Sequence, residues 1–205
     1  MKMKKIHVTS QGVGVQEALA ATEQMGVDRG LGHKEVLRLR LLAEELFGLM
    51  RGVAGDMEAD YWVDREDRNF DLHLKADVVM DQEMRRQLLA ASTSGKNAAA
   101  KGFMGKLREM VAVALLPGDK DEAMLMGMSL GFMSMGSPIG YTAGAESYAW
   151  TMSRYVEELR VSAAQGGEAA EAWDELEKSV VAKLADEVSV SIEGYTVEIV
   201  ISKVF

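Results

Sequence analysis

The chain has 205 residues, 48% of them hydrophobic, which is enough to bury a substantial core as one domain or as one domain with a sizeable insertion. A net charge of -9 argues against nucleic acid or an anionic membrane as a general partner. No apolar run approaches the ~20 residues that cross a bilayer, and the absence of cysteine excludes disulfides and thiolate zinc sites, so we expect a soluble, cytoplasmic protein.

The N-terminal part is predicted to contain a short strand and two helices. The strand covers residues 5–9, with Ile6 and Val8 on one face. The first helix runs from Val15 to Gly26, where the glycine favours a stop, and the second runs from Lys34 to Val53. Apolar residues recur along the second helix at three- and four-residue steps: Val36, Leu39, Ala43, Leu46, Met50 and Val53.

Two half-polar strands follow, Met57–Asp64 and Asn69–Ala76, and they are predicted to pair antiparallel. Apolar and polar residues alternate along the second strand, whose apolar face consists of Phe70, Leu72, Leu74 and Ala76. Strands of this kind belong to a sheet that has helices on one face and water on the other. A buried parallel sheet would show continuous apolar runs instead.

The middle of the chain, from Asp81 to Ala172, is predicted to be helical, and Ser147–Ala164 is one of its helices. The segment 124–135 carries five methionines among glycine and serine residues. Methionine fills irregular gaps and also suits adaptable surfaces. The segment is therefore either part of a core or a contact surface for a partner protein or a second copy of the chain.

A short polar loop within this region is a candidate phosphate-binding element. Gly95, Lys96 and Asn97 precede a predicted helix, where backbone N–H groups and a lysine could approach a phosphate. The full spacing of a phosphate-binding loop is absent.

The C-terminal part is predicted to be a helix, Leu176–Ala185, followed by a hairpin. The first strand of the hairpin is Glu187–Ile192 and the second is Tyr195–Ser202, with the turn at Glu193 and Gly194.

This C-terminal order resembles the end of the small anti-sigma-factor serine kinases of the GHKL (Bergerat-fold) ATPase superfamily. Their DEVxV strand matches Asp186–Val190, and their GxTV strand matches Gly194–Val197, with Lys203 near the end. The resemblance extends over residues 1–80 and 172–205.

The resemblance implies a fold. It is an α/β two-layer sandwich, in which a mixed, mostly antiparallel sheet is covered on one face by helices. Residues 1–205 would form a single domain, and residues 81–172 would be a helical insertion in place of the nucleotide lid.

The resemblance also implies ATP as ligand and assigns site residues. Glu44 stands at the position of the catalytic glutamate, but Gly48 replaces the asparagine that helps to hold Mg²⁺ on the phosphates. Asp77 stands at the position of the aspartate that reads the adenine amino group, and Val79 replaces a glycine that follows it. The phosphate-binding GxGLG opening of the last helix is replaced by the acidic run Asp174–Glu177.

Each surviving residue also has a structural interpretation. Glu44 lies among arginines on a helix and could belong to a solvated ion-pair face. Asp77 could simply end a strand. The three histidines are scattered, so no spacing predicts a metal site.

Three functions are compatible with these observations. The first is a regulatory ATP-binding protein related to the anti-sigma-factor kinases, weakly catalytic or non-catalytic, which phosphorylates or sequesters a protein. The second is a pseudo-ATPase that binds a protein partner, or forms a homodimer, without nucleotide. The third is a small-molecule-binding protein that uses a cleft between sheet and insertion.

Overall fold

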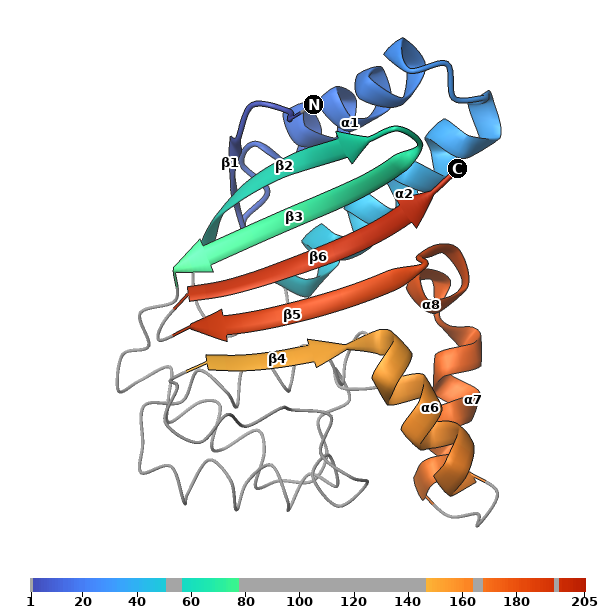
Figure 1. Cartoon of the computed structure of the whole chain (residues 1–205). Helices are drawn as coiled ribbons and strands as arrows, with labels where there is room; N and C mark the ends of the chain where they lie inside the picture. Colours follow the sequence, from blue (N-terminus) through green and yellow to red (C-terminus); the bar gives the residue numbers. More distant parts are fainter. Residues whose placement is uncertain (1, 51–56, 78–146, 164–167, 194–195) are drawn as a thin grey trace.

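The computed structural model describes residues 2–50, 57–77, 147–163, 168–193 and 196–205 (Figure 1). Within these residues, six strands form one sheet in the order β1-β2-β3-β6-β5-β4. The strands are β1 (Ile6–Thr9), β2 (Glu58–Glu66), β3 (Asn69–Asp77), β4 (Ser147–Thr151), β5 (Glu187–Glu193) and β6 (Thr196–Val204). The described helices are α1 (Val15–Asp28), α2 (His33–Met50), α6 (Met152–Ala163), α7 (Glu168–Lys178) and α8 (Val180–Leu184).

The predicted fold class, an α/β sandwich of a sheet and helices, is confirmed. All five predicted strands lie in the same sheet, and β6 pairs with β3 from Asn69↔Val204 to Asp77↔Thr196. The sheet was expected to be mixed, whereas every pairing between the named strands is antiparallel. A short turn imposes this orientation on β2 and β3, whereas β1–β2, β3–β6 and β4–β5 join strands that are separated by helices or longer segments.

The sixth strand corrects one prediction. Residues 147–151 form β4 beside β5, and the helix that was expected to start at Ser147 starts at Met152. Trp150 is buried opposite Val190, and Glu187 Oε1 accepts a hydrogen bond of 3.1 Å from the backbone N–H of Ser153 at the start of α6. These contacts come from β5, so the local helical pattern could not indicate them. The remainder of the predicted helical insertion, up to residue 146, lies outside the described residues.

The predicted C-terminal helix is also divided. Ser179 separates α7 from α8, and its hydroxyl accepts a hydrogen bond of 3.3 Å from the backbone N–H of Ala182. A serine in this position is a favourable helix N-cap. The acidic residues Asp174–Glu177, expected to open the last helix, therefore lie inside α7 rather than at a helix start.

The helices pack on one face of the sheet, where a single hydrophobic cluster connects all of the described elements. The helix α2 lies across β3 and β6 and contacts α8, while α6 packs against β4, β5 and α7. In Figure 1, α2 runs behind the sheet toward the end where β3 finishes and β6 begins. Among the largest fully buried side chains are Tyr61, Phe47, Phe70, Leu72 and Ile201. The opposite face of the sheet carries the polar residues of the alternating strands, and we call it the open face.

Candidate functional site

Glu44 lies in an ion-pair network between the first two helices. Arg40 Nε donates a 2.8 Å hydrogen bond to Glu44 Oε1, and Arg40 Nη1 donates a 2.9 Å hydrogen bond to Glu23 Oε1 on α1. The hydrogen bonds to Glu23 and Glu44 raise the pKa of Arg40 above its ordinary value. The geometry matches the ion-pair interpretation, in which Arg40 holds Glu44 Oε1.

Gly48 lies one turn after Glu44 along the same side of α2. A Cβ built at Gly48 meets no described atom within 4 Å, so steric crowding by described residues does not require glycine there. The position nevertheless has no side-chain oxygen, and the ligand atom that the resemblance would supply for Mg²⁺ is missing.

Asp77 is the last residue of β3 and pairs with Thr196, the first residue of β6. Thr196 Oγ1 donates a 2.6 Å hydrogen bond to Asp77 Oδ1. Strand alternation places Asp77 on the open face together with His73 and Lys75, whereas the neighbouring Ala76 is buried on the helical side. Asp77 therefore lies on the side of the sheet that faces away from α2.

The structure consequently does not bring together the two described residues that the motif analysis selected. Glu44 belongs to the helical layer, and Asp77 belongs to the open face. The other candidates, Gly95, Lys96 and Asn97, lie outside the described residues, as does the methionine-rich segment 124–135.

A second carboxylate–hydroxyl pair on the same two strands provides a comparison. Ser202 Oγ donates a 2.6 Å hydrogen bond to Asp71 Oδ1, and both residues lie on the open face of β3 and β6. The Asp77–Thr196 pair thus has the same local geometry as a pair that lies away from the strand end. Thr196 was not selected from the sequence, although its Gly-x-Thr context belongs to the GxTV match.

An aromatic cluster on the open face was also missed by the sequence analysis. The rings of Trp62 and His73 are stacked, with centroids 4.7 Å apart, and Lys2 and Lys5 place their ammonium groups 4.8 and 4.5 Å from the Trp62 ring centroid. Cross-strand pairing of β2 with β3 brings Trp62 and His73 together, and a bridge between Lys2 and Asp64 brings the N-terminal segment beside them. In the sequence, the only indication of this cluster is that Trp62 and His73 occupy strand positions on the face opposite to the apolar residues.

Hydrogen bonds satisfy the polar groups of this aromatic cluster. His73 Nδ1 lies 2.9 Å from Glu198 Oε1, and Trp62 Nε1 donates a 3.1 Å hydrogen bond to Asp64 Oδ2. Burial acts to raise the pKa of Asp64, but the hydrogen bonds from Trp62 and Lys2 outweigh it and lower that pKa. The cluster therefore covers and stabilises the open face of β2 and β3.

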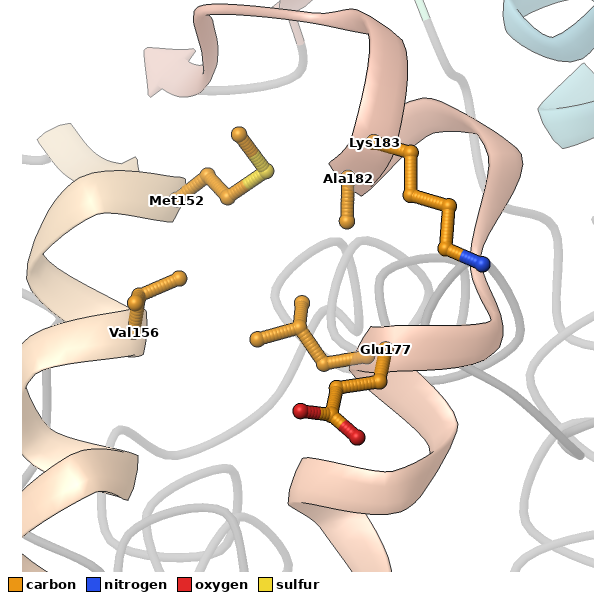
Figure 2. Close-up of a pocket in the computed structure, with 6 residues that line it drawn as sticks. Met152, Val156, Glu177, Ala182 and Lys183 are labelled. Atoms are coloured by element: carbon orange, nitrogen blue, oxygen red, sulfur yellow. The ribbon is translucent and has the colours of Figure 1, made fainter.

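An apolar groove of about 520 Å³ lies between α6, α7 and α8 (Figure 2). Met152 and Val156 line it from α6, Leu176 and Glu177 from α7, and Ala182 and Lys183 from α8. Glu177 Oε1 already accepts a 3.0 Å hydrogen bond from Trp173 Nε1. The groove contains none of the candidate site residues selected from the sequence, and its described lining has no serine, threonine or histidine.

Among the described residues, no group of three or more histidines and carboxylates is placed to bind a metal ion. No described helix is both long enough and apolar enough to cross a membrane.

Comparisons with known proteins gave no match: no family model fits the sequence, and no similar protein was found among curated proteins or solved structures.

Proposed function

We propose that this protein is a GHKL-type regulatory module that acts by binding a protein partner and does not turn over ATP. The placement of Glu44 and Asp77 on opposite sides of the sheet carries this proposal. A catalytic glutamate and a base-reading aspartate must both face one bound nucleotide, and these two residues do not share such a space.

The chemistry of phosphoryl transfer supports the same proposal. Mg²⁺ neutralises charge on the transferred phosphate in this class of reaction. Gly48 supplies no side-chain ligand atom for the ion, and Arg40 already holds Oε1 of Glu44 in an ion pair. The acidic residues within α7 are also engaged locally, since Asp174 pairs with Lys178.

The GHKL-type part of the proposal rests on sequence and topology. The C-terminal hairpin matches the DEVxV and GxTV strands, and β6 lies directly beside β3 in one sheet with the N-terminal strands. A regulatory module with this fold can retain a protein-binding role after its nucleotide motifs are lost.

A second candidate, residual nucleotide binding, is favoured by the Asp77–Thr196 pair. Thr196 donates to Oδ1 of Asp77, and no described residue donates to Oδ2. That oxygen can accept an N–H from an amino group such as the one on adenine.

Thermal unfolding with ATP, ADP and GTP, each with and without Mg²⁺, tests the proposal. A nucleotide present at 100 times its Kd would stabilise the fold by ~2.7 kcal/mol, which corresponds to roughly 5–10 °C in Tm for a chain of this size. We expect no such shift and no Mg²⁺-dependent ATP turnover above background.

If a nucleotide stabilises the protein or is turned over, two sets of variants show which residues are responsible. Stabilisation that is lost in Asp77→Ala and Thr196→Val, but kept in the matched variants Asp71→Ala and Ser202→Ala, would establish the second candidate. ATP turnover that disappears in Glu44→Ala would overturn the proposal.

A further inference from the structure

Trp62 is a buried aromatic side chain on the polar face of the sheet. The residues before and after it in β2 belong to the core, so strand alternation places Trp62 on the open face, where it is nevertheless only 4% exposed. A large side chain at such a position is buried only when other groups cover it. His73 stacks on the indole ring, with an angle of 9° between the two ring planes. Lys2 and Lys5 supply the rest of the described cover.

The two lysines belong to residues 2–5, which we call the N-terminal strap. Lys2 Nζ lies 3.2 Å from Asp64 Oδ2, and Lys5 Nζ lies 3.5 Å from Asp60 Oδ2. Each ammonium group therefore has an aromatic ring and a carboxylate as partners. The four charged side chains are between 34% and 56% exposed, and ion pairs this exposed stabilise a contact only weakly.

The strap also uses its backbone to reach β2. The backbone N–H of Met3 donates a 2.8 Å hydrogen bond to the carbonyl oxygen of Val63, and Lys2 forms an isolated antiparallel bridge with Asp64. The strap thus lies beside β2 as a short extended segment. An extended polypeptide, rather than a free small molecule, matches this combination of backbone and side-chain contacts.

The surroundings of Trp62 suit an ammonium group. An aromatic ring attracts a cation placed over its face, and a neighbouring carboxylate adds charge complementarity. The described ion pairs around Trp62 and His73 contribute three carboxylates, those of Asp60, Asp64 and Glu198, against one lysine outside the strap, Lys75. Without the strap, the surroundings of the ring are therefore predominantly negative.

We propose that Trp62, Asp60 and Asp64 form a binding site for the lysine side chains of a basic segment in a partner protein, and that the N-terminal strap occupies this site until the partner displaces it. The strap shows the chemistry directly, since its own ammonium groups lie 4.8 and 4.5 Å from the ring centroid and pair with both carboxylates. The net charge of -9 attracts a basic segment from a distance. This inference rests on the proposed function, because it names the chemistry of the partner that the module binds.

The test follows the indole N–H resonance of Trp62 in isotope-labelled protein. This group is a suitable reporter because Trp62 Nε1 donates to Asp64 Oδ2, the same oxygen that Lys2 approaches. The variant Lys2→Gln/Lys5→Gln removes the charges of the strap and retains its length. The probe is a capped peptide with the strap sequence Lys-Met-Lys-Lys.

In Lys2→Gln/Lys5→Gln, the peptide should shift the Trp62 resonance saturably with a Kd on the order of 1 mM. The same peptide with acetylated lysines should not shift it, because acetylation removes the charge. The unmodified protein should bind the peptide roughly threefold or more weakly than the variant, because its tethered lysines compete at an effective concentration in the millimolar range.

Further substitutions in the Lys2→Gln/Lys5→Gln protein locate the site. Asp60→Asn/Asp64→Asn should weaken peptide binding about tenfold. Asp60→Asn alone changes an exposed carboxylate and should weaken binding in the same direction. The matched control Glu193→Gln, at an exposed carboxylate on β5, should leave the Kd unchanged, and the indole resonances of Trp150 and Trp173 should not move.

Three results would overturn the inference: no saturable shift in Lys2→Gln/Lys5→Gln, an equal shift with the acetylated peptide, or an unchanged Kd in both aspartate variants. Spermidine that binds as tightly as the peptide would assign the site to free polyamines instead. A dimer in light scattering that Lys2→Gln/Lys5→Gln dissolves would assign it to the strap of a second copy. Nucleotide-dependent stabilisation or ATP turnover tests the proposed function alone, so the two failures are distinguishable.

Discussion

The most instructive single residue in the core is Thr22, a polar side chain that is fully buried on α1. Its hydroxyl donates a 2.7 Å hydrogen bond to the backbone carbonyl of Ala18 and lies 2.8 Å from the hydroxyl of Tyr61, which is also fully buried. Burial raises the pKa of Tyr61, so this phenol stays neutral and needs a hydrogen-bond partner.

The first prediction follows because the Thr22 hydroxyl has two hydrogen-bond partners, whereas the Tyr61 hydroxyl bonds only to Thr22 among the described residues. Thr22→Val leaves the buried Tyr61 hydroxyl without its partner and should lower the free energy of unfolding by about 1–3 kcal/mol. Tyr61→Phe leaves Thr22 bonded to Ala18 and should lower it by only about 0.5–1.5 kcal/mol. Urea unfolding of the two variants measures both values, and a larger loss in Tyr61→Phe would contradict the assignment.

A second prediction concerns Asp186, which binds the C-terminal strand. Its carboxylate accepts hydrogen bonds from the backbone N–H of Val204 at 2.7 Å and from Lys203 Nζ at 2.9 Å. Burial acts to raise the pKa of Asp186, but these two donors outweigh it and lower that pKa below its ordinary value. A lowered folded-state pKa means that the carboxylate stabilises the fold fully above its unfolded-state pKa and loses this effect as the pH falls through the folded-state value.

Asp186→Asn tests this pH dependence because it removes the charge and retains the shape. We expect the variant to melt below the unmodified protein at pH 6–7, with the difference in Tm shrinking below about pH 4. If the Tm of the variant and the Tm of the unmodified protein differ by the same amount from pH 7 to pH 3, the charge of Asp186 does not contribute to stability.

At the scale of elements, the connection between β1 and α1 depends on two glycines with positive φ, Gly12 at 97° and Gly14 at 73°. They differ in their surroundings. A Cβ at Gly14 would lie 2.0 Å from the carbonyl oxygen of His7, whereas a Cβ at Gly12 would meet no described atom within 4 Å. Gly14 thus allows the start of α1 to approach the backbone of the edge strand.

The third prediction compares alanine at these two positions. Gly12→Ala introduces only an unfavourable φ, which should lower the free energy of unfolding by about 1–2 kcal/mol. Gly14→Ala adds a collision between backbone atoms and should destabilise the protein by at least ~2 kcal/mol more. Urea unfolding separates the two variants, and equal losses would show that the β1–α1 connection relaxes easily.

At the scale of the whole molecule, the N-terminal and C-terminal parts of the chain meet where β3 pairs with β6. Leu72 on β3 is opposite Ile201 on β6, and both side chains are fully buried in the common cluster. Because α2 packs against both of these strands and also contacts α8, the two parts should unfold together.

The fourth prediction tests this cooperativity with tryptophan fluorescence. One variant retains only Trp62 on β2, and the other retains only Trp150 on β4, with the remaining tryptophans changed to Phe. In each variant, the urea midpoint from fluorescence should equal the midpoint from circular dichroism. Leu72→Ala should lower the free energy of unfolding by about 2–5 kcal/mol and move both probes together. Separate midpoints would indicate two units that unfold independently.

The sequence by itself determined the elements whose apolar residues repeat with a regular period. The alternation in β2, β3 and β5 identified strands with one buried face, and the three- and four-residue steps identified α2. The same alternation already assigned Asp77 to the polar face, because it follows the apolar Ala76, so the separation of Asp77 from α2 could have been predicted before the structure.

Only the tertiary structure decided which elements are neighbours. Residues 147–151 form a strand because β5 offers a pairing edge and the core accepts Trp150. The partner of Asp77, the stacking of Trp62 on His73 and the contact between α2 and α8 all join residues far apart in the chain. Local periodicity records which side of an element avoids water, but it contains no information about which element covers that side, because that depends on contacts made after the chain has folded.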